Sequence, residues 1–145
     1  MPNLLHRLDN LGELARRFRA ALENCDPTKL PNGLQAFPSG ACADASLLLA
    51  KYLQEKGEGK AEYVSGSDCN QTHAWLELDG IIIDITADQL NRSIDPVIVS
   101  TNSSWHQRFE DRSRRTVTID DYDADTSTSL NAAYQELIHI LEKAQ

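Results

Sequence analysis

The chain has 145 residues, of which 41% are hydrophobic and 25% are charged, and its formal net charge is -8. This length and composition are typical of one globular domain and exclude a largely disordered chain. The acidic balance argues against binding to a nucleic-acid backbone, which relies on clustered lysine and arginine. The apolar runs are too short to cross a bilayer, and the N-terminus lacks the apolar core of a secretion signal. We therefore expect a cytoplasmic protein that binds neither nucleic acid nor a membrane.

Two amphipathic helices are predicted in the first part of the chain. In residues 3–24, apolar residues recur at three- and four-residue spacing, with charged residues between them. Residues 25–40 are rich in proline, glycine and asparagine, which indicates a loop. Residues 41–56 are good helix formers with one apolar face, and Gly57 is a typical helix stop. This second helix is expected to be central, with Cys42 in its first turn.

Short strands are predicted next, in residues 61–66, 72–78 and 81–86. Asp79 and Gly80 separate the last two runs and are typical of a tight hairpin. Because hairpin-linked strands pair antiparallel, this block indicates an antiparallel sheet.

The second half of the chain is less regular. Residues 95–100 and 115–120 are further candidate strands, and the segment between them is ambiguous. The acidic stretch that follows is expected to be a loop, and residues 129–143 have the spacing of a final helix. Helices on either side of hairpin-linked strands predict an α+β fold.

Cys42 has two interpretations. A free cysteine at the start of an apolar helix is often a small buried core residue. The same position favours a thiolate, because unpaired backbone N–H groups and the positive end of the helix dipole stabilise negative charge there. Those N–H groups could also bind an oxyanion.

His73 and Asp84 are the residues that could complete a nucleophilic site. Alternation along the strand places His73 and Trp75 on one face. If Leu78 pairs with Ile81, Asp84 becomes a diagonal neighbour of His73 on that face, within reach of its imidazole. A carboxylate in that place can fix the tautomer of a histidine base. An aspartate among isoleucines is also costly to bury unless it is paired.

Three pieces of this chain resemble the core of the transglutaminase-like cysteine enzymes in order and spacing. They are GACADASLLLAKYLQEKGEGKAEYVSG (40–66), THAWLELDG (72–80) and IIIDIT (81–86). The resemblance implies one domain over 1–145, with the recognisable core at about 34–90. It also implies a papain-like α+β fold, in which the helix of the nucleophile packs on an antiparallel sheet, with N-terminal and C-terminal helices added.

The resemblance also implies roles for the three residues. Cys42 would be the nucleophile, His73 the general base and Asp84 the orienting group of a triad. The chain departs from the family pattern where Ile85 replaces a proline and where Ala61 and Glu62 replace a basic residue.

The implied reaction is acyl transfer or hydrolysis on an amide through a thioester. The amide would be a peptide bond, an isopeptide bond or a glutamine side chain, so a protein or peptide substrate is expected, with no cofactor. Hydrolysis is favoured over cross-linking, because 145 residues leave little room for a second substrate platform. The alternative class is an inactive peptide-binding module or adaptor with the same fold.

Further site candidates surround Cys42 in the sequence. Gln35 lies seven residues before Cys42 and is a candidate oxyanion donor, with the backbone N–H of Cys42 as the other donor. The turn Pro38-Ser39-Gly40 would let a substrate carbonyl reach the thiol. Trp75 either forms a wall of the substrate cleft or packs under a helix.

Cys69 allows three interpretations. Together with His73 and Cys42 it could form a zinc site, but the sequence has no CxxC knuckle, so we expect no metal. It could form a disulfide with Cys42, or it could be an uninvolved cysteine near the cleft. The odd total of three cysteines favours a reducing compartment.

Overall fold

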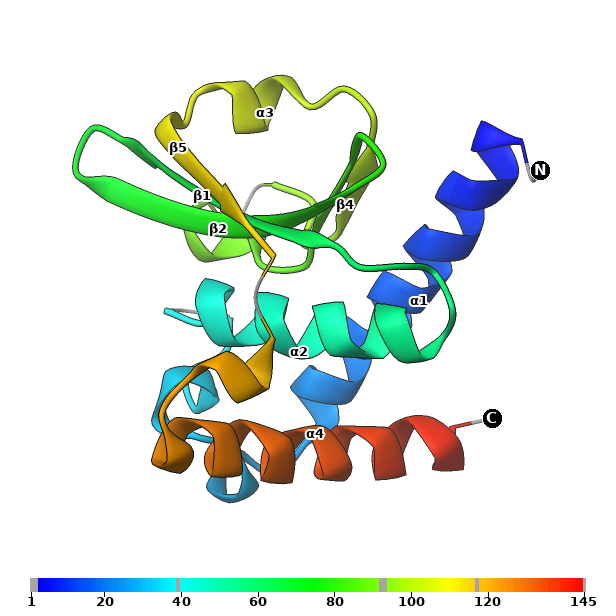
Figure 1. The fold of residues 1–145 in the computed structure, drawn as a ribbon, viewed down its shortest axis with the longest axis vertical. Helices are drawn as coiled ribbons and strands as arrows, with labels where there is room; N and C mark the ends of the chain where they lie inside the picture. Colours follow the sequence, from blue (N-terminus) through cyan, green and yellow to red (C-terminus); the bar gives the residue numbers. More distant parts are fainter. Residues whose placement is uncertain (1–2, 39, 92–93, 117, 145) are drawn as a thin grey trace.

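The structure is a computed structural model that describes residues 3–38, 40–91, 94–116 and 118–144. Within these ranges it is a mixed α+β fold with a five-stranded antiparallel sheet and four α-helices (Figure 1). The helices are α1 (Leu4–Asn24), α2 (Cys42–Glu55), α3 (Ser104–Gln107) and α4 (Ala124–Lys143). The strands are β1 (Glu62–Asp68), β2 (Gln71–Leu78), β3 (Ile81–Asp84), β4 (Ile98–Ser100) and β5 (Glu110–Arg115).

The sheet separates two layers of side chains. Its strand order is β4-β3-β2-β1-β5, so β2 is the central strand. Helix α2 lies against one face, α3 lies over the other, and α4 runs on the far side of α2 (Figure 1). Leu76 and Leu78 of β2 belong to the main core beside α2, whereas Trp75 packs with Val64 and Phe109 on the opposite face. The predicted alternation of β2 is therefore confirmed.

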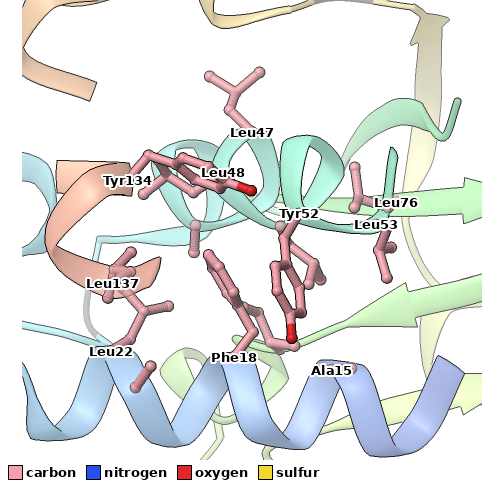
Figure 2. Close-up of a cluster of buried hydrophobic side chains, with 14 of the residues drawn as sticks. Ala15, Phe18, Leu22, Leu47, Leu48, Tyr52, Leu53, Leu76, Tyr134 and Leu137 are labelled. Atoms are coloured by element: carbon pink, nitrogen blue, oxygen red, sulfur yellow. The ribbon is translucent and has the colours of Figure 1, made fainter. Parts of the chain in front are cut away.

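The main core joins three helices to the sheet. Phe18 of α1 and Tyr52 of α2 face each other with their ring centroids 5.1 Å apart, and Tyr134 and Leu137 extend the cluster from α4 (Figure 2). Burial of such large apolar side chains is the main favourable term in folding. Among the described residues, no helix combines the length and the apolar character needed to cross a membrane.

The first two predicted helices and the central hairpin are confirmed. Gly57 has a φ of +81°, the left-handed conformation expected just after a helix. The hairpin has the expected register, with Leu78 opposite Ile81. The β2–β3 ladder ends at Leu76 and Ile83. Asp84, the last residue of β3, lies one residue beyond this last pair.

Two predictions in the second half are wrong. The last strand is not at 115–120: β5 covers Glu110–Arg115, and a 3-10 helix occupies Ile119–Asp121. Val117 lies outside the described residues. All six residues of β5 are exposed, so this edge strand pairs with β1 without the apolar alternation by which a strand is recognised in sequence.

The final helix begins earlier than expected, at Ala124. Its N-cap is Asp123, whose side chain accepts a hydrogen bond from the backbone N–H of Thr126. The acidic stretch that resembles a loop therefore contains the cap and the first turns of α4. Aspartate is a preferred N-cap because it satisfies a backbone donor that the helix leaves unpaired.

Candidate active site

Cys42 is the first residue of α2 and is a partly exposed free thiol. The first intrahelical hydrogen bond runs from Ala45 N to Ala41 O. The backbone N–H groups of Cys42 and the two residues after it therefore have no acceptor within the helix. The sulfur lies at the end of α2 that best stabilises negative charge.

The end of the β2–β3 ladder explains how Cys42 reaches the sheet. Residues 71–75 of β2 extend beyond the last pair with β3. The start of α2 lies at this uncovered edge, where the backbone N–H of Ala74 donates a hydrogen bond to the Cys42 sulfur. His73, the residue before Ala74, is hydrogen-bonded to the same sulfur. The thiol thus approaches β2 from its edge, although α2 packs across one face.

A buried carboxylate holds the other side of the histidine. His73 Nε2 lies 2.7 Å from Asp84 Oδ2, and both side chains are almost fully buried, at 0% and 1% exposed. Asp84 Oδ1 accepts a hydrogen bond from the backbone N–H of Thr86 at 2.8 Å. A row of contacts therefore runs from Cys42 through His73 to Asp84, as the sequence predicts.

A second histidine binds the same carboxylate. His106 Nε2 lies 2.6 Å from Asp84 Oδ2, and His106 Nδ1 lies 2.6 Å from the hydroxyl of Ser103. The network sets the tautomers, because an ionised carboxylate only accepts hydrogen bonds. Both imidazoles donate Nε2–H to Asp84, and the Ser103 hydroxyl donates to His106. The Nδ1 atom of His73 is then left to face Cys42.

Aromatic rings surround His73 on the side away from α2. Its ring is stacked on Trp75 at 5.9 Å between centroids, and it meets Trp105 edge-on at 5.4 Å and Phe109 at 5.5 Å. These apolar neighbours exclude water and limit rotation of the imidazole, which strengthens the hydrogen bond to Asp84.

The pKa values at the site are shifted toward charged forms. Burial alone raises the pKa of Asp84, but hydrogen bonds from His106 and His73 outweigh it and lower the pKa to about 2. Burial alone lowers the pKa of His73, but the hydrogen bonds to Asp84 and Cys42 outweigh it and raise the pKa to about 9. Burial also raises the pKa of the Cys42 thiol, and donors from His73 and Gln89 reverse that effect, leaving the pKa below its ordinary value. The electrostatics favour a thiolate–imidazolium pair.

Gln89 connects the start of α2 with the imidazole. Its side-chain oxygen accepts a hydrogen bond from Ala41 N at 3.2 Å, and its Nε2 lies 3.0 Å from His73 Nδ1. The amide also donates to the Cys42 sulfur. Gln89 ends the 3-10 helix η3 (Ala87–Gln89), which follows closely after β3.

A buried ion pair holds η3 in place. Arg19 of α1 binds both carboxylate oxygens of Asp88, at 2.7 and 2.8 Å, and donates to the carbonyl of Ile85 at 2.7 Å. Arg19 is 6% exposed and Asp88 is 9% exposed. Arg19 therefore binds Ile85, which follows Asp84, and Asp88, which precedes Gln89.

Gln35, Gly40 and Trp75 were also expected at the site, and the structure places each of them differently relative to Cys42. The amide of Gln35 donates to the carbonyl of Leu30 at 3.1 Å, so the side-chain amide observed at Cys42 is that of Gln89. Gly40 has a φ of +68°, which favours glycine, two residues before the thiol. Trp75 is fully buried behind His73, so it does not line an open cleft.

Two further expectations concern the turns. Ser39 lies outside the described residues. Cys69 is exposed in the β1–β2 turn, before β2 begins at Gln71. Among the described residues, the groups close enough to share a metal ion do not include Cys69, so the zinc set that combines it with His73 and Cys42 is not assembled.

His106, Ser103 and Gln89 were missed by the sequence reasoning. The available signal was weak: a histidine between aromatic residues, three positions after a serine that can cap a helix. Ser103 is indeed the N-cap of α3. A glutamine in an irregular segment carries no signal of its own.

Within the part of the chain that the structure describes, His73, Asp84 and His106 could also hold a metal ion, since one ligand atom from each lies within 4.8 Å of the others. Two imidazoles and a carboxylate suit zinc or iron. A metal there would replace the two protons now shared with Asp84. It would bind His73 through Nε2, the nitrogen opposite the one that faces Cys42.

The paired charges give a testable pH dependence of stability. In the unfolded chain histidine loses its proton near pH 6.5, whereas folded His73 keeps it to about pH 9. In a Cys42→Ala variant, Asp84 still raises the pKa of His73, so the folded state binds more protons above pH 6.5. The free energy of unfolding should then fall as pH rises, by at most about 1.4 kcal/mol per pH unit.

In the wild type this slope should be smaller at pH values below about 8.5, where the thiol of the unfolded chain is still protonated. The Cys42 proton that the folded state has released compensates for the extra proton on His73. Urea unfolding at several pH values measures both slopes, with Cys69→Ser as the control for loss of an exposed thiol. Equal slopes in the wild type and Cys42→Ala would contradict the ion pair.

Comparison with protein-family models, with curated proteins and with solved structures finds no match for this chain.

Proposed function

We propose that the chain is a cysteine-dependent enzyme with a transglutaminase-like, papain-like core, which acts on an amide carbonyl through a thioester. The observation that carries this proposal is the hydrogen-bonded row Cys42–His73–Asp84, with the thiol at a helix start. A nucleophile, a base and a group that orients the base are the three parts that cysteine acyl transfer needs.

The steps follow from the charges. The Cys42 thiolate attacks the carbonyl carbon, and donors at the start of α2 stabilise the oxyanion. The His73 imidazolium then protonates the leaving amine, and neutral His73 activates water for hydrolysis of the thioester. Asp84 stabilises the imidazolium and keeps Nδ1 directed at the sulfur. An amine in place of water would complete a transfer reaction.

The substrate proposed is a protein or peptide, with hydrolysis of a peptide bond, an isopeptide bond or a glutamine side chain as the reaction. The proposed compartment is the cytoplasm, because Cys25, Cys42 and Cys69 are all free thiols, as expected in a reducing environment.

Alkylation with iodoacetamide across pH, followed at each cysteine by mass spectrometry, tests the nucleophile. Cys42 should react with an apparent pKa well below the ordinary thiol value of about 8.5, since His73 and Gln89 stabilise its thiolate. The exposed Cys69 is the internal reference. His73→Ala should raise the apparent pKa of Cys42, whereas His139→Ala, an exposed histidine of α4, should leave it unchanged.

If Cys42 and Cys69 instead titrate alike, the enzyme proposal fails and the inactive peptide-binding module takes its place. If Cys42 is activated, glutamine-containing and isopeptide-containing peptides can be screened with the wild type and Cys42→Ala. Turnover in the wild type alone would identify the bond that is cleaved.

A further inference from the structure

Gln89 holds its amide in one orientation at the reacting atoms. The backbone N–H of Ala41 can only donate, so the Gln89 atom 3.2 Å from it is the side-chain oxygen. The NH₂ group must then point at His73 and Cys42, where Nε2 lies 3.0 Å from His73 Nδ1. The amide therefore supplies hydrogen-bond donors, and no acceptor, to the site.

The acceptor of the Gln89 amide depends on whether the proton is on the Cys42 sulfur or on His73 Nδ1. When His73 is neutral, its Nε2–H is on Asp84 and its Nδ1 lone pair accepts from Gln89. When the Cys42 proton moves to Nδ1, that lone pair is used, and Gln89 loses its acceptor. The negative charge appears at the same moment on the sulfur, to which the Gln89 amide can also donate.

We propose that Gln89 is a catalytic residue whose side-chain amide, oriented by the backbone N–H of Ala41 toward Cys42, donates to the oxyanion formed at Cys42. This inference rests on the proposed function. It assigns to Gln89 the role for which the sequence indicated Gln35.

The step starts from the thiolate–imidazolium pair, in which the Cys42 proton is already on His73 Nδ1. The sulfur electron pair forms the S–C bond while the carbonyl π pair moves to oxygen. The oxyanion and the Cys42 sulfur are bonded to the same carbon. The oxyanion therefore lies beside the Gln89 amide, which donates to the sulfur. The backbone N–H of Cys42 supplies the second donor.

The Gln89 amide stabilises the transition state more than it stabilises the ground state. In the thiolate–imidazolium pair the Gln89 amide donates to the Cys42 sulfur. As the S–C bond forms, the negative charge moves from sulfur to the carbonyl oxygen, which is a stronger hydrogen-bond acceptor than sulfur. The charge develops while Gln89 is held by Ala41 at one end and by η3 at the other. A donor fixed in advance does not have to reorganise during the reaction, which is the basis of oxyanion stabilisation.

Two reagents distinguish donation to the oxyanion by Gln89 from a purely structural role of Gln89. Iodoacetamide alkylates the Cys42 thiolate by direct displacement, without an oxyanion, whereas p-nitrophenyl acetate acylates it through a tetrahedral oxyanion. For Gln89→Ala we expect the acylation rate at the pH plateau to fall on the order of 10²–10³-fold. The plateau rate of alkylation should stay close to that of the wild type, while the apparent pKa of Cys42 rises.

Gln89→Glu is the second variant, because it keeps an oxygen for Ala41 N and removes the donor. It should lose acylation at least as strongly as Gln89→Ala, while its thermal unfolding midpoint stays nearer that of the wild type. Gln135→Ala, an exposed glutamine of α4, is the matched control and should change neither rate.

Three results would overturn the inference. They are equal losses of alkylation and acylation, unchanged acylation in both Gln89 variants, and loss of acylation in Gln35→Ala alone. If the wild type is not acylated at Cys42 at all, the proposed function itself fails. That outcome is distinct, because it appears before any variant is compared.

Discussion

Asp84→Asn is expected to lower the rate of acylation of Cys42 by p-nitrophenyl acetate on the order of 10⁴-fold. Two buried imidazoles, those of His73 and His106, donate to the same oxygen of Asp84. An amide has one acceptor oxygen and one donor nitrogen, so it cannot serve both histidines as the carboxylate does. If the amide donates to His73 Nε2, the proton moves to Nδ1, and the base can no longer accept the proton of Cys42.

The same substitution should change the pH profile of alkylation. Without the carboxylate, the pKa of His73 is no longer held at about 9, so the thiolate loses its paired cation. The apparent pKa of Cys42 should rise toward the ordinary value of about 8.5. Asp125→Asn, at an exposed position of α4, is the matched control. An acylation rate within about tenfold of the wild type would exclude the triad role of Asp84, given the loss expected when a histidine base is held in the wrong tautomer.

Arg19→Ala is expected to lower the free energy of unfolding by about 3–5 kcal/mol, because it leaves the carboxylate of Asp88 buried without its cation. The Ile85 carbonyl loses a donor as well. Urea unfolding measures the loss. Arg16→Ala, at an exposed position of the same helix, is the matched control and should change stability by less than about 0.5 kcal/mol.

A double variant distinguishes the effect of the ion pair on protein stability from its effect on the position of Gln89. Replacement of a buried ion pair by apolar residues of similar size is often neutral for stability. Arg19→Met combined with Asp88→Leu should therefore recover most of the lost stability. It should not recover the full acylation rate, because η3 and Gln89 are no longer held by directed hydrogen bonds. A loss of unfolding free energy below about 1 kcal/mol in Arg19→Ala would show that this ion pair does not anchor η3.

The local pattern of the sequence was sufficient for several elements. The apolar spacing of α1 and α2 and the Asp79-Gly80 turn are properties of neighbouring residues, and each predicted its element correctly. The register of the hairpin followed from that turn, and it brought Asp84 to the side of His73 where the two are hydrogen-bonded. The position of Cys42 at a helix start was likewise readable from the turn before it.

The errors occurred where the partner of a segment is distant in the chain. Strand β5 is an exposed, charged edge that forms by pairing with β1, so it has no alternation of its own. The start of α4 depends on the cap formed by Asp123 in an acidic stretch that resembles a loop. Gln35 was a candidate because of its sequence distance to Cys42, and Gln89 was not considered. The structure brings the Gln89 amide to the thiol, whereas the Gln35 amide binds the carbonyl of Leu30.

By itself, the sequence determined which helices and strands form around Cys42, and that His73 and Asp84 share one face of a hairpin. These features depend on spacing within a few residues. Only the tertiary structure decided that His106 binds the far side of Asp84, that Gln89 faces the thiol and that Arg19 holds η3. Each of these contacts joins segments separated by more than fifteen residues, and each is specified by burial and hydrogen-bond satisfaction in the folded chain. No local pattern encodes such a contact, because its energy exists only after the segments have packed together.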